Sequence, residues 1–156
     1  MLLSASLAAP GARAAVHYQR LKSFGFPVLN GQSPDAPLLQ GSDGALYGTT
    51  YYGGASNVGV VFKLNQDGTA YRALHSFAGL AASDGERPLA GLVEGTDGVL
   101  YGTTKNGGSN NAGTVFTLNK DGSAYGVLRH FGAPGDGLNP YAGLVQATDG
   151  DRKSVV

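Results

Sequence analysis

A tandem repeat constrains the fold of this chain more than any other feature of its sequence. The pentapeptide Leu-Tyr-Gly-Thr-Thr occurs at residues 46–50 and again at residues 100–104, and the Gly-Gly and Val-Phe pairs that follow it return at the same interval of 54 residues. Between residues 41–77 and residues 95–131, 22 of 37 positions are identical. A fixed interval of this size indicates a repeat architecture, in which each unit buries its apolar faces against its neighbours.

The repeat units are flanked by two segments of a different kind. Residues 1–14 contain a short apolar run and end in Ala-Arg-Ala, which is typical of a secretory signal. We expect a partial signal peptide there, and the alternative is an incidental alanine-rich terminus. Residues 151–156 match the translation of a common sequencing-library adapter, so we expect a non-native tail on a truncated chain. Residues 15–150 are expected to hold one partial repeat (16–34), two full repeats (35–88 and 89–140) and a second partial repeat (141–150).

Composition argues against several classes of function. The chain has 11 basic and 11 acidic residues in no single cluster, so we expect no nucleic-acid partner. It has no cysteine, which excludes disulfides, thiolate metal sites and a thiol nucleophile. No apolar run approaches the roughly 20 residues of a membrane span, so we expect none in this fragment.

Each full repeat is predicted to form four short antiparallel strands. Asp-Gly pairs separate the first strand from the second and the third from the fourth, and such pairs favour tight hairpins. The fourth segment has the pattern Tyr-x-x-Leu-x-x-Phe at residues 71–77 and 125–131, and the same pattern occurs at residues 18–24. We interpret it as a strand buried on both faces, because alternate faces then receive the apolar residues.

Four strands per repeat favour an all-β, β-propeller-like tandem repeat of about 54 residues per blade, arranged as an incomplete ring. Other all-β stacks are the alternative. Because a repeat array gains stability from contacts between neighbours, a chain with few repeats and open faces is expected to be marginally stable and prone to association.

The repeated motifs resemble those of a known family. Asp-Gly-x-Leu-Tyr-Gly-Thr-Thr, Gly-Gly and Gly-x-Val-Phe-x-Leu-Asn-x-Asp-Gly-x-x-Tyr, followed by Leu-x-x-Phe, are similar to the tandem repeat of choice-of-anchor proteins that contain GloVer repeats. The resemblance covers residues 18–150. It implies a secreted or surface-displayed bacterial repeat protein with no established activity, and it supplies no catalytic residue.

The sequence contains no convincing centre for catalysis or metal binding. Asn65 with Asp67 and Asn119 with Asp121 place oxygen ligands two residues apart, but a calcium loop needs six or more oxygens, and hairpin turns explain these residues better. The three histidines, His17, His75 and His130, lack the companions of a zinc site and are interpreted as packed or surface residues. We therefore predict no catalytic residue, no metal and no cofactor.

The leading hypothesis is a non-enzymatic binding or adhesion scaffold, secreted or displayed on the cell surface. The alternative is the propeller part of an extracellular polysaccharide-active enzyme. Loops that differ between copies are the places for recognition, and these are the loop after the second strand and the connector between repeats. We predict ligand contacts from Tyr51, Tyr52, Lys105 and Asn106, with a glycan, surface polymer or protein as partner. The repeated Asn57 and Asn111 are interpreted as structural.

Overall fold

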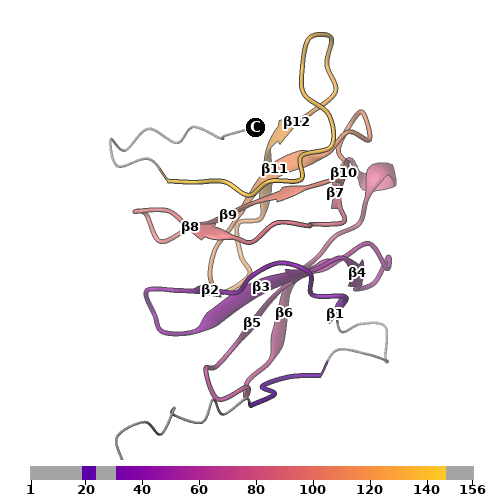
Figure 1. Cartoon of the computed structure of the whole chain (residues 1–156). Helices are drawn as coiled ribbons and strands as arrows, with labels where there is room; N and C mark the ends of the chain where they lie inside the picture. Colours follow the sequence, from indigo (N-terminus) through magenta and orange to yellow (C-terminus); the bar gives the residue numbers. More distant parts are fainter. Residues whose placement is uncertain (1–18, 24–30, 147–156) are drawn as a thin grey trace, which may run out of the picture.

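The computed structural model describes residues 19–23 and 31–146, and these form a fold made almost entirely of short β-strands. Figure 1 shows two larger sheets stacked one above the other, the lower formed by the earlier part of the chain. Within the described ranges the one helical element is a single 3-10 turn, η1 (Leu80–Ala82), and no helix is suited to crossing a membrane. The predicted signal peptide, His17 and the tail at 151–156 lie outside the described residues.

Each larger sheet contains four antiparallel strands in the order of the sequence, as predicted for each repeat. Consecutive strands pair with each other, so both sheets are meanders, and neither closes into a barrel. The all-β, antiparallel part of the prediction is therefore confirmed. Sheet one consists of β2 (Leu39–Gln40), β3 (Leu46–Thr50), β5 (Val60–Leu64) and β6 (Arg72–Ser76), and sheet two consists of β8 (Val93–Glu94), β9 (Leu100–Thr104), β11 (Thr114–Leu118) and β12 (Gly126–His130).

Two small ladders tie the connectors to the loops that follow the second strand of each sheet. β1 (Gly31–Gln32) pairs with β4 (Tyr52–Gly53), and β7 (Gly85–Glu86) pairs with β10 (Asn106–Gly107). All four short strands lie at the right-hand edge in Figure 1, which we call the loop edge. The connectors and variable loops therefore share one edge, as the sequence predicted.

The fourth strand of each sheet carries a β-bulge that explains its Tyr-x-x-Leu-x-x-Phe pattern. In sheet one, Ala73 pairs with Phe62 and His75 with Val61, which leaves Leu74 as the extra residue. Because a bulge shifts the alternation of side chains, the tyrosine before it and the phenylalanine after it turn to opposite sides of the sheet. Tyr71 lies 5.6 Å from the ring of Phe62 on one side, whereas Phe77 contacts sheet two on the other.

The prediction that the fourth strand is buried on both faces is wrong. Arg72 and Ala73 of β6 are exposed, and Leu128 of β12 is 61% exposed. The physical reason is that β6 and β12 are edge strands, so each has a neighbouring strand on one side. The two central strands of each sheet are the buried ones.

The core lies between the two sheets. Tyr47 and Val61 of sheet one pack with Leu100 and Phe116 of sheet two in one buried cluster, to which Phe77 also belongs. The glycine in each Leu-Tyr-Gly-Thr-Thr strand leaves room for the phenylalanine of the next strand, whose ring crosses over it. Phe116 belongs to the core between the sheets, whereas Phe62 lies on the opposite face of sheet one, beside Tyr71. A Cβ on Gly48 would lie 2.5 Å from Phe62 Cζ, and a Cβ on Gly102 would lie 2.6 Å from Phe116 Cζ.

Candidate functional site

The four residues predicted to bind a ligand lie at the loop edge. Tyr51 follows β3, and its ring meets that of Tyr52 edge-on at a centroid distance of 4.6 Å. Tyr52 is 39% exposed. Lys105 and Asn106 take the equivalent places after β9 and are partly buried. The structure thus places all four residues at one edge.

Two further residues connect this cluster, and sequence reasoning missed both. The Arg87 guanidinium lies 5.7 Å from the ring centroid of Tyr51, and the backbone N–H of Lys105 donates to the Arg87 carbonyl at 3.2 Å. Lys105 Nζ in turn lies 4.8 Å from the ring centroid of Tyr141, which is 65% exposed. Contact with the Tyr141 hydroxyl raises the pKa of Lys105, so the amine is charged at neutral pH.

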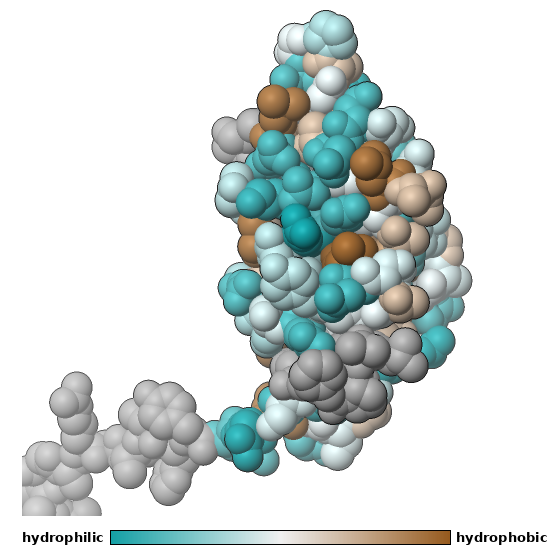
Figure 2. All heavy atoms as spheres, turned by 90° about the vertical axis from the view of Figure 1, so that its right-hand side faces the viewer, coloured by the Kyte–Doolittle hydropathy of each residue, from teal (hydrophilic) through white to brown (hydrophobic). Residues whose placement is uncertain are grey.

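These contacts form a row of two cationic residues flanked by two tyrosines, which we call the loop-edge row: Tyr51, Arg87, Lys105 and Tyr141. Such a row can stack on the faces of sugar rings and attract negative charge. Figure 2 views the loop edge and shows mainly hydrophilic residues, with hydrophobic ones scattered singly. A polar ligand therefore fits this edge better than an apolar one.

Asn57 and Asn111 are structural, as interpreted from their repetition. Both adopt positive φ angles, 56° and 54°. The Asn57 Oδ1 accepts a hydrogen bond from the Gly53 N–H at 3.0 Å, and the Asn111 Oδ1 accepts one from the Gly107 N–H at 3.1 Å. Asparagine tolerates this left-handed conformation and closes the loop with its own side chain.

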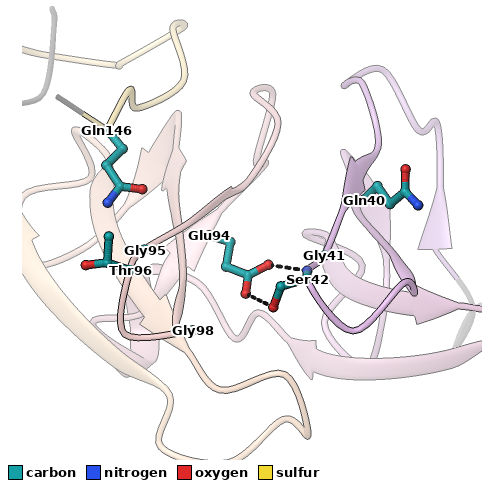
Figure 3. Close-up of a pocket in the computed structure, with 8 residues that line it drawn as sticks. All are labelled: Gln40, Gly41, Ser42, Glu94, Gly95, Thr96, Gly98 and Gln146. Carbon is teal, nitrogen blue, oxygen red and sulfur yellow. Dashed lines mark hydrogen bonds between the residues drawn. The ribbon is translucent and has the colours of Figure 1, made fainter. Parts of the chain in front are cut away.

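A shallow polar depression lies at the opposite edge, where the Asp-Gly turns of the two sheets meet (Figure 3). Its volume is about 560 Å³. Gln40, Glu94 and Gln146 line it from equivalent positions in three successive repeats. The Glu94 carboxylate is already occupied, because it accepts hydrogen bonds from the Ser42 N–H at 2.8 Å and the Ser42 hydroxyl at 2.6 Å and also pairs with Lys120. Glu94 of sheet two is therefore joined to the Ser42 turn of sheet one at this edge.

A small charged cluster beside this depression fixes the first Asp-Gly turn. The Tyr47 hydroxyl donates to Asp43 Oδ2 at 2.8 Å, and Lys63 Nζ lies 2.9 Å from the same oxygen. The hydrogen bond from Lys63 is the main cause that lowers the pKa of Asp43 to about 2. The carboxyl thus remains ionised and holds the turn at any pH near neutrality.

We expect the pKa of Asp43 to rise toward the ordinary value of about 3.9 when Lys63 is replaced with Gln. The amide keeps much of the side-chain length but removes the positive charge. NMR titration of the Asp43 carboxyl carbon measures the shift directly. Lys105→Gln at the loop edge is the matched control and should leave the pKa of Asp43 unchanged; an equal response to both changes would contradict this role for Lys63.

The Asp-Gly hairpins use their oxygen atoms within the turn. Asp67 Oδ1 accepts from the backbone N–H of Thr69 at 2.9 Å and from its hydroxyl at 2.6 Å, and Asp121 bonds Ser123 in the same way. No group of three or more His, Cys, Asp or Glu residues that could hold a metal ion occurs in the part of the chain that the structure describes. Asx turns account for the repeated aspartates.

The two described histidines lie in different environments. His130 Nδ1 accepts from the Ser109 N–H at 3.2 Å, the place that Ser76 fills in the first repeat. His75 stacks on Tyr125 with centroids 3.6 Å apart, and its Nε2 lies 3.2 Å from Asp84 Oδ2. Sequence reasoning missed this His-Asp-Tyr contact because its members come from two different repeats.

Asp84 is the polar centre of the contact between the sheets. Its carboxylate accepts from the Ala78 N–H at 2.8 Å, the Gly85 N–H at 2.6 Å and the Tyr125 hydroxyl. Burial alone would raise the pKa of Asp84, but hydrogen bonds from His75, Tyr125 and the backbone lower it. Burial and the neighbouring carboxylate both raise the pKa of Tyr125, so its hydroxyl stays protonated and donates.

The repeated sheets and their recurring contacts define an all-β tandem repeat protein. The chain belongs to the Gloeobacter/Verrucomicrobia repeat family, whose model matches residues 12–152. This match confirms the resemblance noted from the repeated motifs. A search of curated proteins finds no relative of matching sequence.

Proposed function

We propose that this protein is a non-enzymatic binding scaffold, secreted or displayed on the bacterial surface, that holds an acidic polysaccharide or similar surface polymer at its loop edge. The observation that carries the proposal is the loop-edge row, in which Tyr51 and Tyr141 flank Arg87 and Lys105. Two cations with aromatic neighbours match a polymer of sugar rings that bears carboxylates.

The stacking of the two sheets supports this proposal. Two four-stranded meanders with the same strand order stack face to face, and the connectors and variable loops of both reach one edge. A propeller built from such blades would present several copies of this edge around one face. A long polymer can bind several copies of a weak site at once. Such linked contacts raise the overall affinity well above the affinity of a single site.

The repeated chemistry favours a scaffold over an enzyme. The His75–Asp84 pair is the group closest to an acid–base pair, yet Arg129 and Asp136 take the equivalent positions in the next repeat and pair at 3.0 Å. A guanidinium at the histidine position cannot exchange protons near neutral pH. Because the same contact with an aspartate forms with His75 in one repeat and with Arg129 in the next, we interpret it as structural and assign it no catalytic role.

The double replacement of Tyr51 and Tyr52 with Ala is expected to weaken binding of polygalacturonate, an acidic polysaccharide, by about tenfold, since exposed aromatic anchors dominate such contacts. Lys105→Gln should weaken it further at low salt, because each lost cation reduces the electrostatic attraction. Isothermal titration calorimetry with the full chain measures both effects, and dextran serves as the neutral polymer.

Gln40→Ala is the matched control, because Gln40 is exposed at the opposite edge. This change should leave the affinity for polygalacturonate as it is. Equal binding of dextran and polygalacturonate, or an unaltered affinity in the Tyr51 and Tyr52 variant, would overturn the assignment of the loop edge.

A further inference from the structure

Arg87 adopts a backbone conformation that its side chain disfavours. Its φ angle is 56°, in the left-handed region. The residue before the connector proline has the same conformation in the other repeats, but there it is Ser33 or Asn139. Asparagine tolerates this region because its short side chain can hydrogen-bond to nearby backbone, whereas a bulky side chain is an outlier there. Arg87 therefore lowers the stability of the connector relative to an asparagine at the same position.

Backbone hydrogen bonds hold this position in both full repeats. The Arg87 N–H donates to the Val58 carbonyl at 2.7 Å, and the Asn139 N–H donates to the Ala112 carbonyl at 2.7 Å. The Asn139 side chain adds a further bond, because its Nδ2 donates to the Lys105 carbonyl at 3.0 Å. The Arg87 side chain makes no hydrogen bond to any residue that the structure describes. Arginine thus gives the fold less at this position than asparagine does.

Two buried polar atoms beside this position lack a hydrogen-bond partner in the described ranges, Nε of Arg87 and Oδ1 of Asn106. Arg87 directly follows β7, and Asn106 begins β10, the strand that pairs with β7. Both residues are partly exposed, so rotation of either side chain can bring its polar atom to the surface. Because buried polar groups are nearly always hydrogen-bonded, this ladder is a place where an external partner is expected.

Arg87 and Lys105 are two neighbouring cations, and no carboxylate of the described residues pairs with either. The ion pairs in that part of the chain join other residues. Contact with the Tyr141 hydroxyl raises the pKa of Lys105, and the nearby charge of Arg87 acts in the opposite direction. The carboxylate of Glu86, the acid next to Arg87, is used within the connector, where its Oε1 accepts from the Leu80 N–H at 3.0 Å. The two positive charges therefore lack a negative counterpart at this ladder.

We propose that Arg87 and Lys105 together hold the free carboxylate of a uronate unit, and that Arg87 selects this carboxylate over its neutral ester. This inference rests on the function proposed above and adds the chemical group that is recognised. The guanidinium offers two N–H donors to one carboxylate, and Lys105 supplies a second positive charge. Hydroxyl groups of the same sugar can donate to Asn106 Oδ1, and the Tyr51 ring beside the guanidinium can pack on the sugar ring.

Arg87→Asn separates binding from stability. Asparagine suits the left-handed conformation, and it can donate to the Tyr51 carbonyl as Asn139 donates to the Lys105 carbonyl. The midpoint of urea unfolding should therefore rise. The affinity for polygalacturonate should fall at least about tenfold, because charge-assisted hydrogen bonds are lost. Isothermal titration calorimetry with the full chain measures the affinity. An arginine with a structural role alone would instead lower the unfolding midpoint when replaced.

Fully methyl-esterified polygalacturonate tests the selectivity, since the ester removes the charge and keeps the sugar rings. The unaltered chain should bind the ester at least about tenfold more weakly than the acid, and Arg87→Asn should reduce this ratio. Ser33→Asn is the matched control, because Ser33 has the same conformation in the first repeat, and it should change neither the affinity nor the ratio.

Three outcomes would contradict the assignment. Polygalacturonate binding by the unaltered chain with an unaltered ratio in Arg87→Asn would overturn the role of Arg87 and leave the function proposed above intact. A lower unfolding midpoint in Arg87→Asn would likewise show that Arg87 is a structural residue. Failure of the unaltered chain to bind polygalacturonate would overturn both proposals.

Discussion

Replacement of Phe77 with Ala is expected to destabilise the protein by about 3–5 kcal/mol, the cost of removing a fully buried phenylalanine. Phe77 is 0% exposed, and its ring meets Phe116 of sheet two edge-on at 5.2 Å. It also lies 4.9 Å from the ring of His75. Its loss leaves a cavity between the sheets, where no neighbouring side chain can fill the space without moving the other sheet. Urea unfolding followed by circular dichroism measures the change in the free energy of unfolding.

Phe131 provides the matched control for this prediction. It occupies the same position in the second repeat but is only partly buried. Phe131→Ala should therefore cost less than about 1.5 kcal/mol, because less apolar surface returns to water. Equal costs for the two changes would show that the sheet interface does not depend on Phe77 as the structure indicates.

The strands and turns of this fold were accessible from the sequence because they depend on local chemistry. Asp-Gly pairs mark the hairpins, and alternating apolar residues mark the central strands. The two repeats supported the same strand and turn predictions, since a pattern that occurs twice at the same spacing is unlikely to arise by chance. The bulges at Leu74 and Leu128 were not predicted, because the Tyr-x-x-Leu-x-x-Phe spacing also fits a regular strand buried on both faces.

The candidate site was accessible only in part. Variation between copies located Tyr51, Tyr52, Lys105 and Asn106 at one edge. Arg87 and Tyr141 were missed because they come from connectors, and their contacts with this edge depend on how the repeats pack. One signal was available: the residue before the proline of each connector is Ser33, Arg87 or Asn139, so it varies as the predicted binding positions do.

Asp84 shows that residues in the same turn pattern can contribute very different amounts to the free energy of unfolding. Asp84 and Asp136 both begin an Asp-Gly-x-x-Pro connector. Asp84 is 8% exposed and bonds residues of both sheets, whereas the described partners of Asp136 are the neighbouring Gly137 N–H and the exposed Arg129. The difference arises from the sheet that packs over Asp84, which the connector sequence cannot reveal.

Asp84→Ala is expected to cost about 3 kcal/mol, because it leaves the Tyr125 hydroxyl and the Ala78 N–H without their acceptor in a buried place. Asp136→Ala at the equivalent position should cost less than about 1 kcal/mol, since it breaks a contact to an exposed arginine. Urea unfolding at pH 7 compares the two variants. A larger cost for Asp136→Ala would contradict the assignment of Asp84 as the polar centre of the interface.

The pH dependence of unfolding tests the same assignment independently. The pKa of Asp84 is lowered in the folded protein, so the unfolded state binds a proton more readily. The stabilising contribution of Asp84 is therefore fully present above the unfolded pKa of about 3.9 and is lost as the pH falls below it. Asp84→Asn removes this titration, so the free energy of unfolding should fall less steeply with decreasing pH below about 4 than in the unaltered protein. Asp43, whose pKa is about 2, contributes in the same range in both proteins and cancels from the comparison. Identical slopes in this range would show that the Asp84 carboxylate contributes nothing to holding the two sheets together.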